Sequence, residues 1–292
     1  MKKSRKFGIV GGDMRQYYLA KSLLKDGHNV LIFGFDKIAD KRDEFKKLSL
    51  SQVILLSDYI IFPVPITRDS RNLNAPFSEN EIYIDAHMMS LLKNKKVFGG
   101  VIIPPIEKHV KNNKFLFYDY YKEDFIIPNA HLTAEGAVKV FLEKSLKSVN
   151  KSKCLVVGYG RIGKILCEIL KNLGANVTAS ARNIEDKAFI EQKGYDFVNT
   201  NRIIDDKNLK FYDSIFNTVP APIFNENILT KISYDTILID LASEPGGVDK
   251  KSAKKLNIKF FYELGIPGRY FPKSAGEITK KTIYQIITEE NI

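Results

Sequence analysis

A glycine-rich run near the middle of the chain is the clearest candidate for chemistry. Its sequence is Gly158-Tyr-Gly-Arg-Ile-Gly163; it follows an apolar run and opens a stretch with helical spacing. In this context the first glycine makes a tight turn, the second lets the backbone approach a pyrophosphate, and the third lets the helix pack closely. Unpaired N–H groups at the helix start favour negative charge. The motif therefore predicts a dinucleotide site at Gly158, Tyr159, Gly160, Arg161, Ile162 and Gly163.

The end of the following strand indicates which dinucleotide binds. A site that prefers NAD usually carries Asp or Glu there, and this acid binds the ribose 2′-hydroxyl. Here the strand ends Thr178-Ala-Ser-Ala-Arg182 and contains no acid. Ser180 and Arg182 would suit a 2′-phosphate, so the sequence favours NADP over NAD. The alternative is that Arg182 is a solvated surface residue.

Two loops at predicted strand ends are expected to line the nicotinamide half of the cofactor pocket. They are Asn217-Thr-Val-Pro220 and Asp240-Leu-Ala-Ser243. Ligands of open α/β sheets bind at the carboxyl ends of strands. Ordinary turn chemistry is the alternative for both loops. The expected cofactor contacts are Thr218, Val219, Pro220, Leu241 and Ala242.

A second glycine-rich run lies near the N-terminus and reads Gly11-Gly-Asp-Met-Arg-Gln16. It lacks the third glycine, so we expect a poor dinucleotide site. A helix N-terminus followed by Arg15 could receive a substrate carboxylate, with Asp13 positioning Arg15 or an incoming ammonium or imine group. The alternative for Asp13 is a helix N-cap.

Exclusion of other chemistries leaves hydride transfer. The sequence has no serine nucleophile elbow, no His-Glu-x-x-His motif and no P-loop lysine. Cys154 and Cys167 form no CxxC pair, so no metal site is expected. None of the four histidines follows the glycine-rich motif, which disfavours a mechanism with a late His; His131 is a weak site candidate. Cationic candidates for an anionic substrate are Arg15, Arg269 and Lys273, each with an ordinary surface position as the alternative.

The two glycine-rich runs belong to two related strand-turn-helix-strand units. An offset of 147 residues places Gly11 on Gly158 and Gly27 on Gly174. The expected fold is α/β, with two Rossmann-like doubly wound domains and an interdomain cleft, a layout that resembles the two-domain hydroxyacid dehydrogenases. The expected domains are a substrate domain at 1–130, a linker helix with the NADP-binding domain at 131–271, and a C-terminal helix at 272–292 that packs back on the first domain.

Apolar runs and helical spacing predict the individual elements. A helix over 131–149 is expected to link the domains, with Glu135 in its first turn. Residues 265–272 are expected to form a loop and residues 275–289 the last helix. The expected strands are 7–11, 29–33, 59–64, 96–103 and 115–118, joined partly by polar connections, and then 154–158, 176–180, 195–198, 213–217, 236–241 and 259–262.

The composition of the 292-residue chain is that of a folded globular protein, with 44% hydrophobic and 27% charged residues. A net charge of +11 favours anionic partners such as phosphorylated cofactors or dicarboxylates. No RNA-binding signature or helix-turn-helix spacing occurs, so nucleic acid is not an expected partner. The chain has no signal-peptide run and no apolar stretch of about 18 residues, so we expect a soluble cytoplasmic protein without membrane contact.

Eight short runs follow one another from near residue 7 to near residue 280. They are Gly11-Gly-Asp-Met-Arg-Gln16, Gly34-Phe-Asp36, Thr133-Ala-Glu-Gly136, Gly158-Tyr-Gly-Arg-Ile-Gly163, Asp240-Leu-Ala-Ser243, Pro245-Gly-Gly247, Gly265-Ile-Pro-Gly268 and Pro272-Lys-Ser-Ala-Gly276. In this combination and order they resemble the family of dipicolinate synthase A subunits from spore-forming bacteria.

The resemblance implies oxidation of dihydrodipicolinate to dipicolinate with NADP, in the mother cell during sporulation and together with the B subunit of dipicolinate synthase. For that reaction we expect Arg15 and Arg269 to bind the carboxylates, with Asp13 and Ser274 as further substrate contacts. Lys273 or Glu135 would accept the proton, Glu135 if burial raises its pKa. Alternatives are another NAD(P)-dependent dehydrogenase of a small carboxylic acid and a non-catalytic NADP-binding regulatory subunit. A homodimer also stays open.

Overall fold

The computed structural model describes residues 4–38, 45–112 and 115–292, and the chain divides into two compact units. Unit 1 comprises the chain up to Asn129 together with Pro267–Ile292, and unit 2 comprises Ala130–Ile266. The long helix α5 (Glu123–Lys144) begins in unit 1 and continues into unit 2. Each unit has its own parallel sheet and its own core.

Unit 1 is built on a five-stranded parallel sheet with the order β2-β1-β3-β4-β5. Gly8 in β1, the second strand of this order, lies opposite Leu31 on one side and Ile60 on the other. Successive strand residues point to opposite faces, so Phe7 and Ile9 enter one apolar cluster and Val10 the other. The strands are β1 (Lys6–Val10), β2 (Asn29–Phe33), β3 (Tyr59–Ile61), β4 (Lys96–Gly99) and β5 (Leu116–Asp119).

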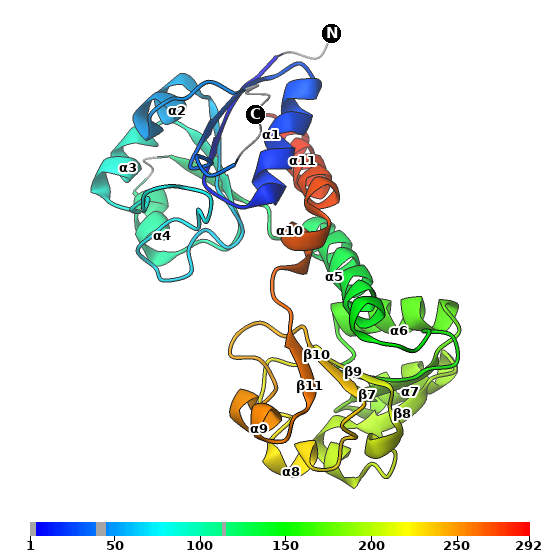
Figure 1. Ribbon diagram of the computed structural model, residues 1–292. Coiled ribbons are helices and arrows are strands. Elements are labelled where there is room, and N and C mark those ends of the chain that lie inside the picture. Colours follow the sequence, from blue (N-terminus) through cyan, green and yellow to red (C-terminus); the bar gives the residue numbers. More distant parts are fainter. Residues whose placement is uncertain (1–3, 39–44, 113–114) are drawn as a thin grey trace. The chain divides into compact units, whose positions relative to one another are not determined.

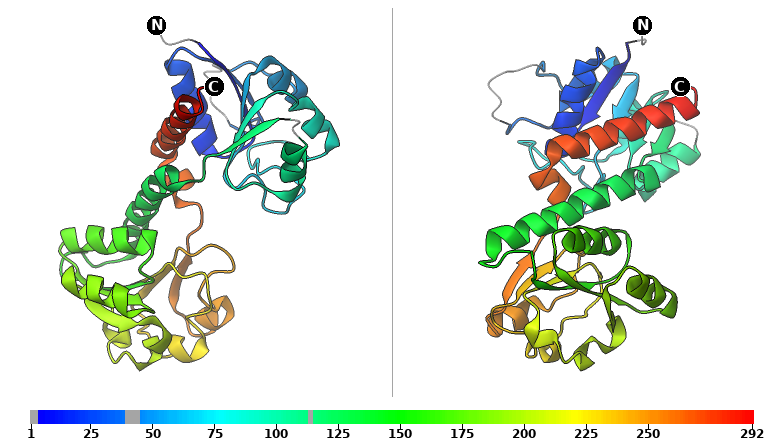
Figure 2. Two further views of the ribbon diagram at one scale, coloured as in Figure 1. Left: turned by 180° about the vertical axis from the view of Figure 1, so that it is seen from behind. Right: turned by 90° about the vertical axis from the view of Figure 1, so that its right-hand side faces the viewer.

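Helices cover both faces of this sheet, and the last helix of the chain packs against the first (Figures 1 and 2). Gly276 makes the close approach between α1 and α11, because a Cβ there would lie 2.9 Å from the Arg15 carbonyl oxygen. Only glycine fits at that distance. The helices of unit 1 besides α5 are α1 (Met14–Lys25), α2 (Leu50–Leu56), α3 (Ala86–Leu91), α4 (Pro104–Lys111), α10 (Ile266–Tyr270) and α11 (Pro272–Glu289).

Unit 2 contains a six-stranded parallel sheet with the order β11-β10-β9-β6-β7-β8. This is the doubly wound order in which dinucleotides bind where the connections change direction, here between β6 and β9. The strands are β6 (Lys153–Val157), β7 (Asn176–Ala181), β8 (Asp196–Asn199), β9 (Ser214–Asn217), β10 (Ile237–Asp240) and β11 (Lys259–Tyr262). The helical segments are α6 (Arg161–Asn172), α7 (Ile184–Gln192), η1 (Thr200–Asp205), η2 (Leu209–Phe211), α8 (Glu226–Leu229) and α9 (Lys250–Lys255).

The predicted bounds of the linking helix were wrong. The helix α5 starts at Glu123, eight residues before the predicted start, and continues through Pro128. Glu123 and Asp124 occupy its first turn, where the helix dipole favours acids, so Glu135 lies in the middle of the helix. The helix ends at Lys144, before a turn in which the Lys147 N–H donates to Ser145 Oγ.

Several short helices lie in segments that were predicted as loops or connections. Residues 265–272, predicted as a loop, contain α10, which follows Gly265 in a left-handed conformation (φ +65°) and has Pro267 near its start. The polar connections of the first half contain α2, α3 and α4. Within the described residues, no helix is both long and apolar enough to span a membrane.

Candidate functional site

The glycine turn of unit 2 is a tight connection between β6 and α6. Gly158 has φ +97°, and a Cβ there would lie 2.4 Å from Thr218 Oγ1. A Cβ on Gly163 would lie only 2.0 Å from the Gly158 carbonyl oxygen, so the first turn of α6 packs directly on the strand-to-helix turn. The first and third glycines are therefore required by the protein's own packing.

Gly160 has a different environment. It is the N-cap residue of α6, with extended backbone angles that any residue can adopt (φ −82°, ψ −161°) and no side-chain cap from the described residues. Apart from Gly160 and its two neighbours in the chain, no heavy atom of the described residues lies within 4 Å of the position of a Cβ at Gly160. Gly160 thus has no side chain to cap the first N–H groups of α6 and lies beside an open space, an arrangement that suits a pyrophosphate.

The residues between these glycines differ in exposure. Tyr159 is 9% exposed, and burial raises the pKa of its phenol to about 12. The Lys164 ammonium lies 5.3 Å from the centre of the Tyr159 ring. Arg161 is exposed and Ile162 is half-buried. Tyr159 is thus largely packed into unit 2, whereas Arg161 keeps solvent-accessible surface near the helix start.

The two residues predicted to bind a 2′-phosphate at the end of β7, Ser180 and Arg182, have different surroundings. Ser180 is fully buried: its hydroxyl accepts a hydrogen bond from the Gly158 N–H (3.3 Å) and lies 2.9 Å from Thr200 Oγ1. The prediction that Ser180 binds the phosphate directly is therefore wrong, because the hydroxyl has no accessible surface and instead supports the glycine turn. Arg182 is exposed and forms no hydrogen bond or ion pair with any described residue.

The loops after β9 and β10 are joined by a buried carboxylate that sequence reasoning did not single out. Asp240 is fully buried and accepts hydrogen bonds from Asn217 Nδ2 (2.8 Å), the Ala242 N–H (3.1 Å) and the Gly247 N–H (2.8 Å). A Cβ on Gly246 would lie 2.8 Å from Asp240 Oδ2. The run Pro245-Gly-Gly247 was the available signal, because an acid that accepts backbone N–H groups needs small residues nearby.

These two loops do not expose the predicted cofactor contacts equally. Thr218, Val219 and Pro220 keep accessible surface, and Thr218 Oγ1 donates to the Val157 carbonyl oxygen (3.0 Å). Leu241 and Ala242 are 6% and 3% exposed. The loop after β9 therefore presents side chains that a ligand could contact, whereas Leu241 and Ala242 are part of the core.

The glycine-rich run of unit 1 is closed by its own side chains. Asp13 is the N-cap of α1, and Asp13 with Gln16 forms a reciprocal capping box. A Cβ on Gly12 would lie 2.6 Å from Gln16, and one on Gly11 would lie 2.7 Å from Leu73. The N-cap alternative for Asp13 is thus confirmed, and the space at this helix start is filled by protein.

Asp13 also holds Arg15, as one of the sequence hypotheses proposed. Arg15 Nε and Nη2 each donate to the Asp13 carboxylate at 2.9 Å, and Nη2 also donates to the Val64 carbonyl oxygen at 2.9 Å. Burial would lower the pKa of Arg15, but the charge and hydrogen bonds of Asp13 outweigh burial and raise it. Arg15 is only 9% exposed, and Nη1 is the guanidinium nitrogen that these hydrogen bonds to Asp13 and Val64 do not use.

The other substrate candidates of unit 1 lie near this pair or on the following helix. A Cβ on Gly268 would lie 2.6 Å from Asp13 Oδ2, which brings α10 against the Asp13–Arg15 pair. Arg269 is exposed, with its guanidinium 5.2 Å from the centre of the Tyr270 ring. Lys273 and Ser274 are exposed in the first turn of α11.

Glu135 does not have the surroundings that its predicted role requires. It lies in unit 2, its side chain is 44% exposed, and its carboxylate is 3.4 Å from His131 Nε2. The condition set for Glu135 as the proton acceptor, burial of its carboxylate, is therefore not met. His131, a weak site candidate, is its partner one turn earlier and is 53% exposed.

Family models match both parts of the chain. Residues 6–121 match the N-terminal domain of the dipicolinate synthase A subunit. Residues 130–249 match the NAD-binding domain of D-isomer specific 2-hydroxyacid dehydrogenases. The second match confirms the prediction of a nicotinamide dinucleotide as cofactor and of a domain typical of oxidoreductases.

Individual proteins match over nearly the full length. The dipicolinate synthase A subunit of Bacillus subtilis (strain 168) is 28% identical over 287 residues, which cover 97% of this chain and 96% of that protein. The crystal structure of the dipicolinate synthase A subunit from Bacillus halodurans has a TM-score of 0.83 and 26% identity, covering 98% of this chain and 99% of that one. D-lactate dehydrogenase from Escherichia coli shares the fold, with a TM-score of 0.58 and 11% identity, covering 98% of this chain and 97% of that one. This agrees with the predicted two-domain α/β layout. Residues 6–121 thus match the N-terminal domains of dipicolinate synthase A subunits, and the resemblance of the whole chain to these proteins is confirmed.

Proposed function

We propose that this chain oxidises dihydrodipicolinate to dipicolinate with NADP⁺ as the hydride acceptor. It would act with a partner, the B subunit of dipicolinate synthase, in the cytoplasm of the mother cell of a sporulating bacterium. The observation that carries the proposal is the similarity to a dipicolinate synthase A subunit over 97% of the chain, with an open glycine turn in the part that matches an NAD-binding domain.

The choice of NADP over NAD rests on the end of β7. No acid stands there to bind a ribose 2′-hydroxyl, and Arg182 is exposed immediately after the strand. A guanidinium binds a phosphate through two parallel N–H donors, which a hydroxyl cannot match. Of the two predicted phosphate contacts, Arg182 is the one that stays in this proposal.

The reaction converts a dihydropyridine into an aromatic ring, which favours the product. When bound, the oxidised nicotinamide accepts a hydride from the substrate ring, and one proton is released as the ring becomes aromatic. The protein's task is then mainly to bind and orient a dianionic substrate. We assign this to cations of unit 1: Arg269 and Lys273, which are exposed, and Arg15 through Nη1, with Ser274 as a further hydrogen-bonding group. Lys273 is also the candidate acceptor of the released proton.

A direct test supplies the purified chain with dihydrodipicolinate and either NADP⁺ or NAD⁺, with and without the purified B subunit. Formation of NADPH and dipicolinate, faster than formation of NADH, is expected. Binding of NADP⁺ without turnover in any of these mixtures would overturn the catalytic role and support a regulatory one. Turnover of other 2-hydroxy or amino acids in place of dihydrodipicolinate would support a different dehydrogenase.

The role of Lys273 is tested by Lys273→Met. The expected result is a large fall in the rate with an unchanged affinity for NADP⁺, because the side chain belongs to unit 1 and the glycine turn to unit 2. The control is Lys281→Met, another exposed lysine of α11. Equal turnover by Lys273→Met and the wild type would remove Lys273 from the substrate site.

A further inference from the structure

The end of the unit 2 sheet at which the strands begin, opposite the glycine turn, has an unusual surface. All strands of this sheet are parallel, so their amino ends lie at one end of the sheet, and their carboxyl ends lie at the other end together with the glycine turn. At the amino ends, exposed apolar side chains occur among exposed lysines. We call this the lysine-flanked surface and define it by Leu146, Lys147, Lys153, Lys210, Phe211 and Tyr234.

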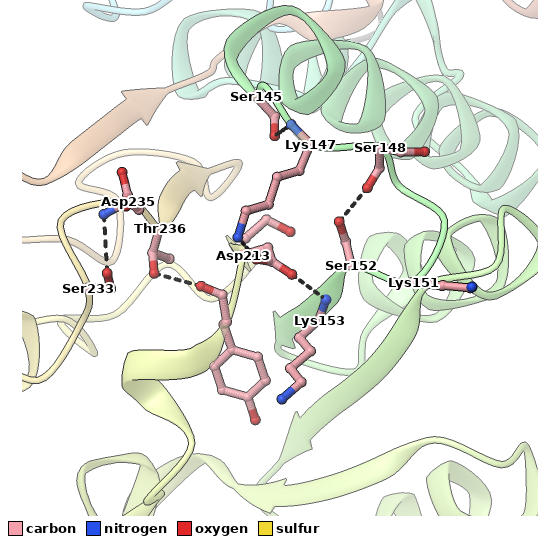
Figure 3. A network of polar contacts seen from close by, with 12 residues as sticks. Ser145, Lys147, Ser148, Lys151, Ser152, Lys153, Asp213, Ser233, Asp235 and Thr236 are labelled. Atoms are coloured by element: carbon pink, nitrogen blue, oxygen red, sulfur yellow. Dashed lines mark hydrogen bonds and ion pairs between the residues drawn. The ribbon is translucent and has the colours of Figure 1, made fainter.

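A central acid fixes the segments that carry this surface. Asp213 precedes β9; it accepts a hydrogen bond from the Lys153 N–H (2.8 Å) and is ion-paired with Lys147. Figure 3 shows Lys147 and Lys153 approaching Asp213 from the chain that enters β6, with Asp235 and Thr236 beside them. Thr236 Oγ1 donates to the Tyr212 carbonyl oxygen, which ties the turn before β10 to the start of β9. The surface is therefore built on anchored backbone.

Its apolar members are strongly exposed. Leu146 is fully exposed, Tyr234 is 72% exposed and Phe211 is 53% exposed. The Lys210 and Lys153 ammonium groups lie 4.9 and 5.7 Å from the centre of the Phe211 ring. Exposed aromatic rings are enriched in protein interfaces, where aromatic anchors are surrounded by a polar rim.

The charges select the kind of partner. A second copy of this chain would bring +11 against +11, which disfavours self-association through a lysine surface. Single-stranded nucleic acid binds through bases stacked on open aromatic faces, and here two ammonium groups already lie close to the Phe211 ring. Carboxylates of a folded protein could pair with Lys153 and Lys210 while an apolar group covers Phe211.

We infer that the lysine-flanked surface docks an acidic face of the partner B subunit. This inference rests on the partner assigned under the proposed function, and it adds where and by which chemistry that partner binds. Docking at the amino ends of the strands would leave the carboxyl ends of β6 and β9, and with them the glycine turn, free for the cofactor.

The test compares two double charge reversals in the full-length chain. Lys153→Glu with Lys210→Glu changes the surface, and Lys193→Glu with Lys254→Glu changes the net charge equally at exposed positions outside it. Lys147 is left unchanged because it pairs with Asp213. Calorimetry at two salt concentrations measures the affinity for the purified B subunit. The affinity for NADP⁺ is measured in parallel as a control for the fold.

The first double variant is expected to bind about 100-fold more weakly to the B subunit, with a smaller dependence on salt, and to bind NADP⁺ like the wild type. Phe211→Ala, which leaves the charge unchanged, is expected to lose about tenfold. Equal weakening by both double variants, unchanged affinity of the first, or failure of the wild type to bind the B subunit would each overturn the inference. Reduction of NADP⁺ by the chain without the B subunit tests the proposed function separately, so failure of the docking inference can be told apart from failure of the proposed function.

Discussion

The starts of α1 and α6 have nearly the same backbone geometry, but they differ in how the first N–H groups of the helix are capped. With the 147-residue offset, Asp13 corresponds to Gly160, and both are N-caps with nearly the same backbone angles: φ −101°, ψ −163° against φ −82°, ψ −161°. In unit 1 the first N–H groups are capped by the Asp13 carboxylate. In unit 2 the N-cap is Gly160, which has no side chain to cap them. The same backbone therefore yields a self-capped helix start in one unit and, in the other, the helix start that we propose as an anion site.

The third position of the motif strengthens the contrast. Gln16 corresponds to Gly163 at the same offset. The Gln16 side chain accepts a hydrogen bond from the Asp13 N–H and occupies the space beside Gly12. At Gly163 the space belongs to the Gly158 carbonyl oxygen. A side chain at this position completes the cap in unit 1, whereas in unit 2 it would displace the turn.

The largest expected effect follows from filling that space. Gly163→Ala would place a Cβ 2.0 Å from the Gly158 oxygen, which is backbone and cannot rotate away. We expect the free energy of unfolding to fall by about 3 kcal/mol or more and cofactor binding to be lost, because the turn itself must shift. Chemical denaturation and calorimetric titration with NADP⁺ measure the two effects. Wild-type stability and affinity in this variant would show that the turn tolerates a Cβ.

The corresponding change in unit 1 is Asp13→Ala, which is expected to lower stability and to leave NADP⁺ affinity unchanged. It removes the cap of α1 and leaves the buried Arg15 guanidinium without its carboxylate. Loss of one partner of a buried pair costs about 3–5 kcal/mol. Asp13→Asn separates the causes, because an amide still caps the helix but removes the negative charge. A drop in NADP⁺ affinity in either variant would contradict the assignment of the two helix starts to different roles.

Much of this contrast could be predicted from sequence. Asn29–Phe33 and Lys259–Tyr262 agree with the predicted strands to the residue, because short apolar runs between turn residues define strands. The absent third glycine predicted a poor dinucleotide site in unit 1, and the capping role of Asp13, which the structure shows, was one of two stated alternatives.

Features that depend on packing could not be predicted. Ser180 was assigned to the ligand because strand position does not reveal that Thr200, from a later segment, lies beside its hydroxyl. Asp240 was treated as part of a loop, although it binds two segments together through three donors. The start of α5 was missed because helical spacing was recognised only from residue 131, whereas the helix begins at Glu123 and accommodates Pro128 within its second turn.

A smaller effect concerns the specificity of the open site. Arg182→Asp is expected to weaken NADP⁺ binding by about 10–100-fold, since a charge-assisted hydrogen bond contributes about 1.5–3 kcal/mol. It should leave NAD⁺ binding unchanged or slightly stronger, because an acid at the strand end suits a 2′-hydroxyl. Calorimetric titration with both nucleotides gives the two constants, and Lys254→Asp controls for net charge. Equal loss for both nucleotides would remove Arg182 from the 2′-phosphate site.

The smallest effect concerns the other ends of the two helices. The C-cap of α1 is Asp26, ion-paired with Lys280 of α11 at 3.0 Å, whereas the corresponding C-cap of α6 is Leu173. Burial would raise the pKa of Asp26, but hydrogen bonds from Lys280 and Tyr284 outweigh burial and lower it. The stabilisation is therefore fully present above the unfolded-state pKa and is lost as pH falls through the lower folded-state pKa.

Unfolding free energies of the wild type and Asp26→Asn between pH 6 and pH 3 measure this contribution. The wild type should be more stable at pH 6, and the difference should shrink as the pH falls below about 4, the usual range of an aspartate. A difference that stays constant or grows on acidification would contradict the assigned ion pair.

The most direct test of the central claim converts the open helix start into the closed one. Gly160→Asp copies Asp13 at a backbone position that accepts any residue and has no neighbouring atom of the described chain within 4 Å. Folding should be unchanged. Calorimetric titration with NADP⁺ should show an affinity reduced by about 100-fold or more, because a carboxylate would cap the N–H groups and repel the pyrophosphate. Binding of NADP⁺ to Gly160→Asp with wild-type affinity would contradict the account.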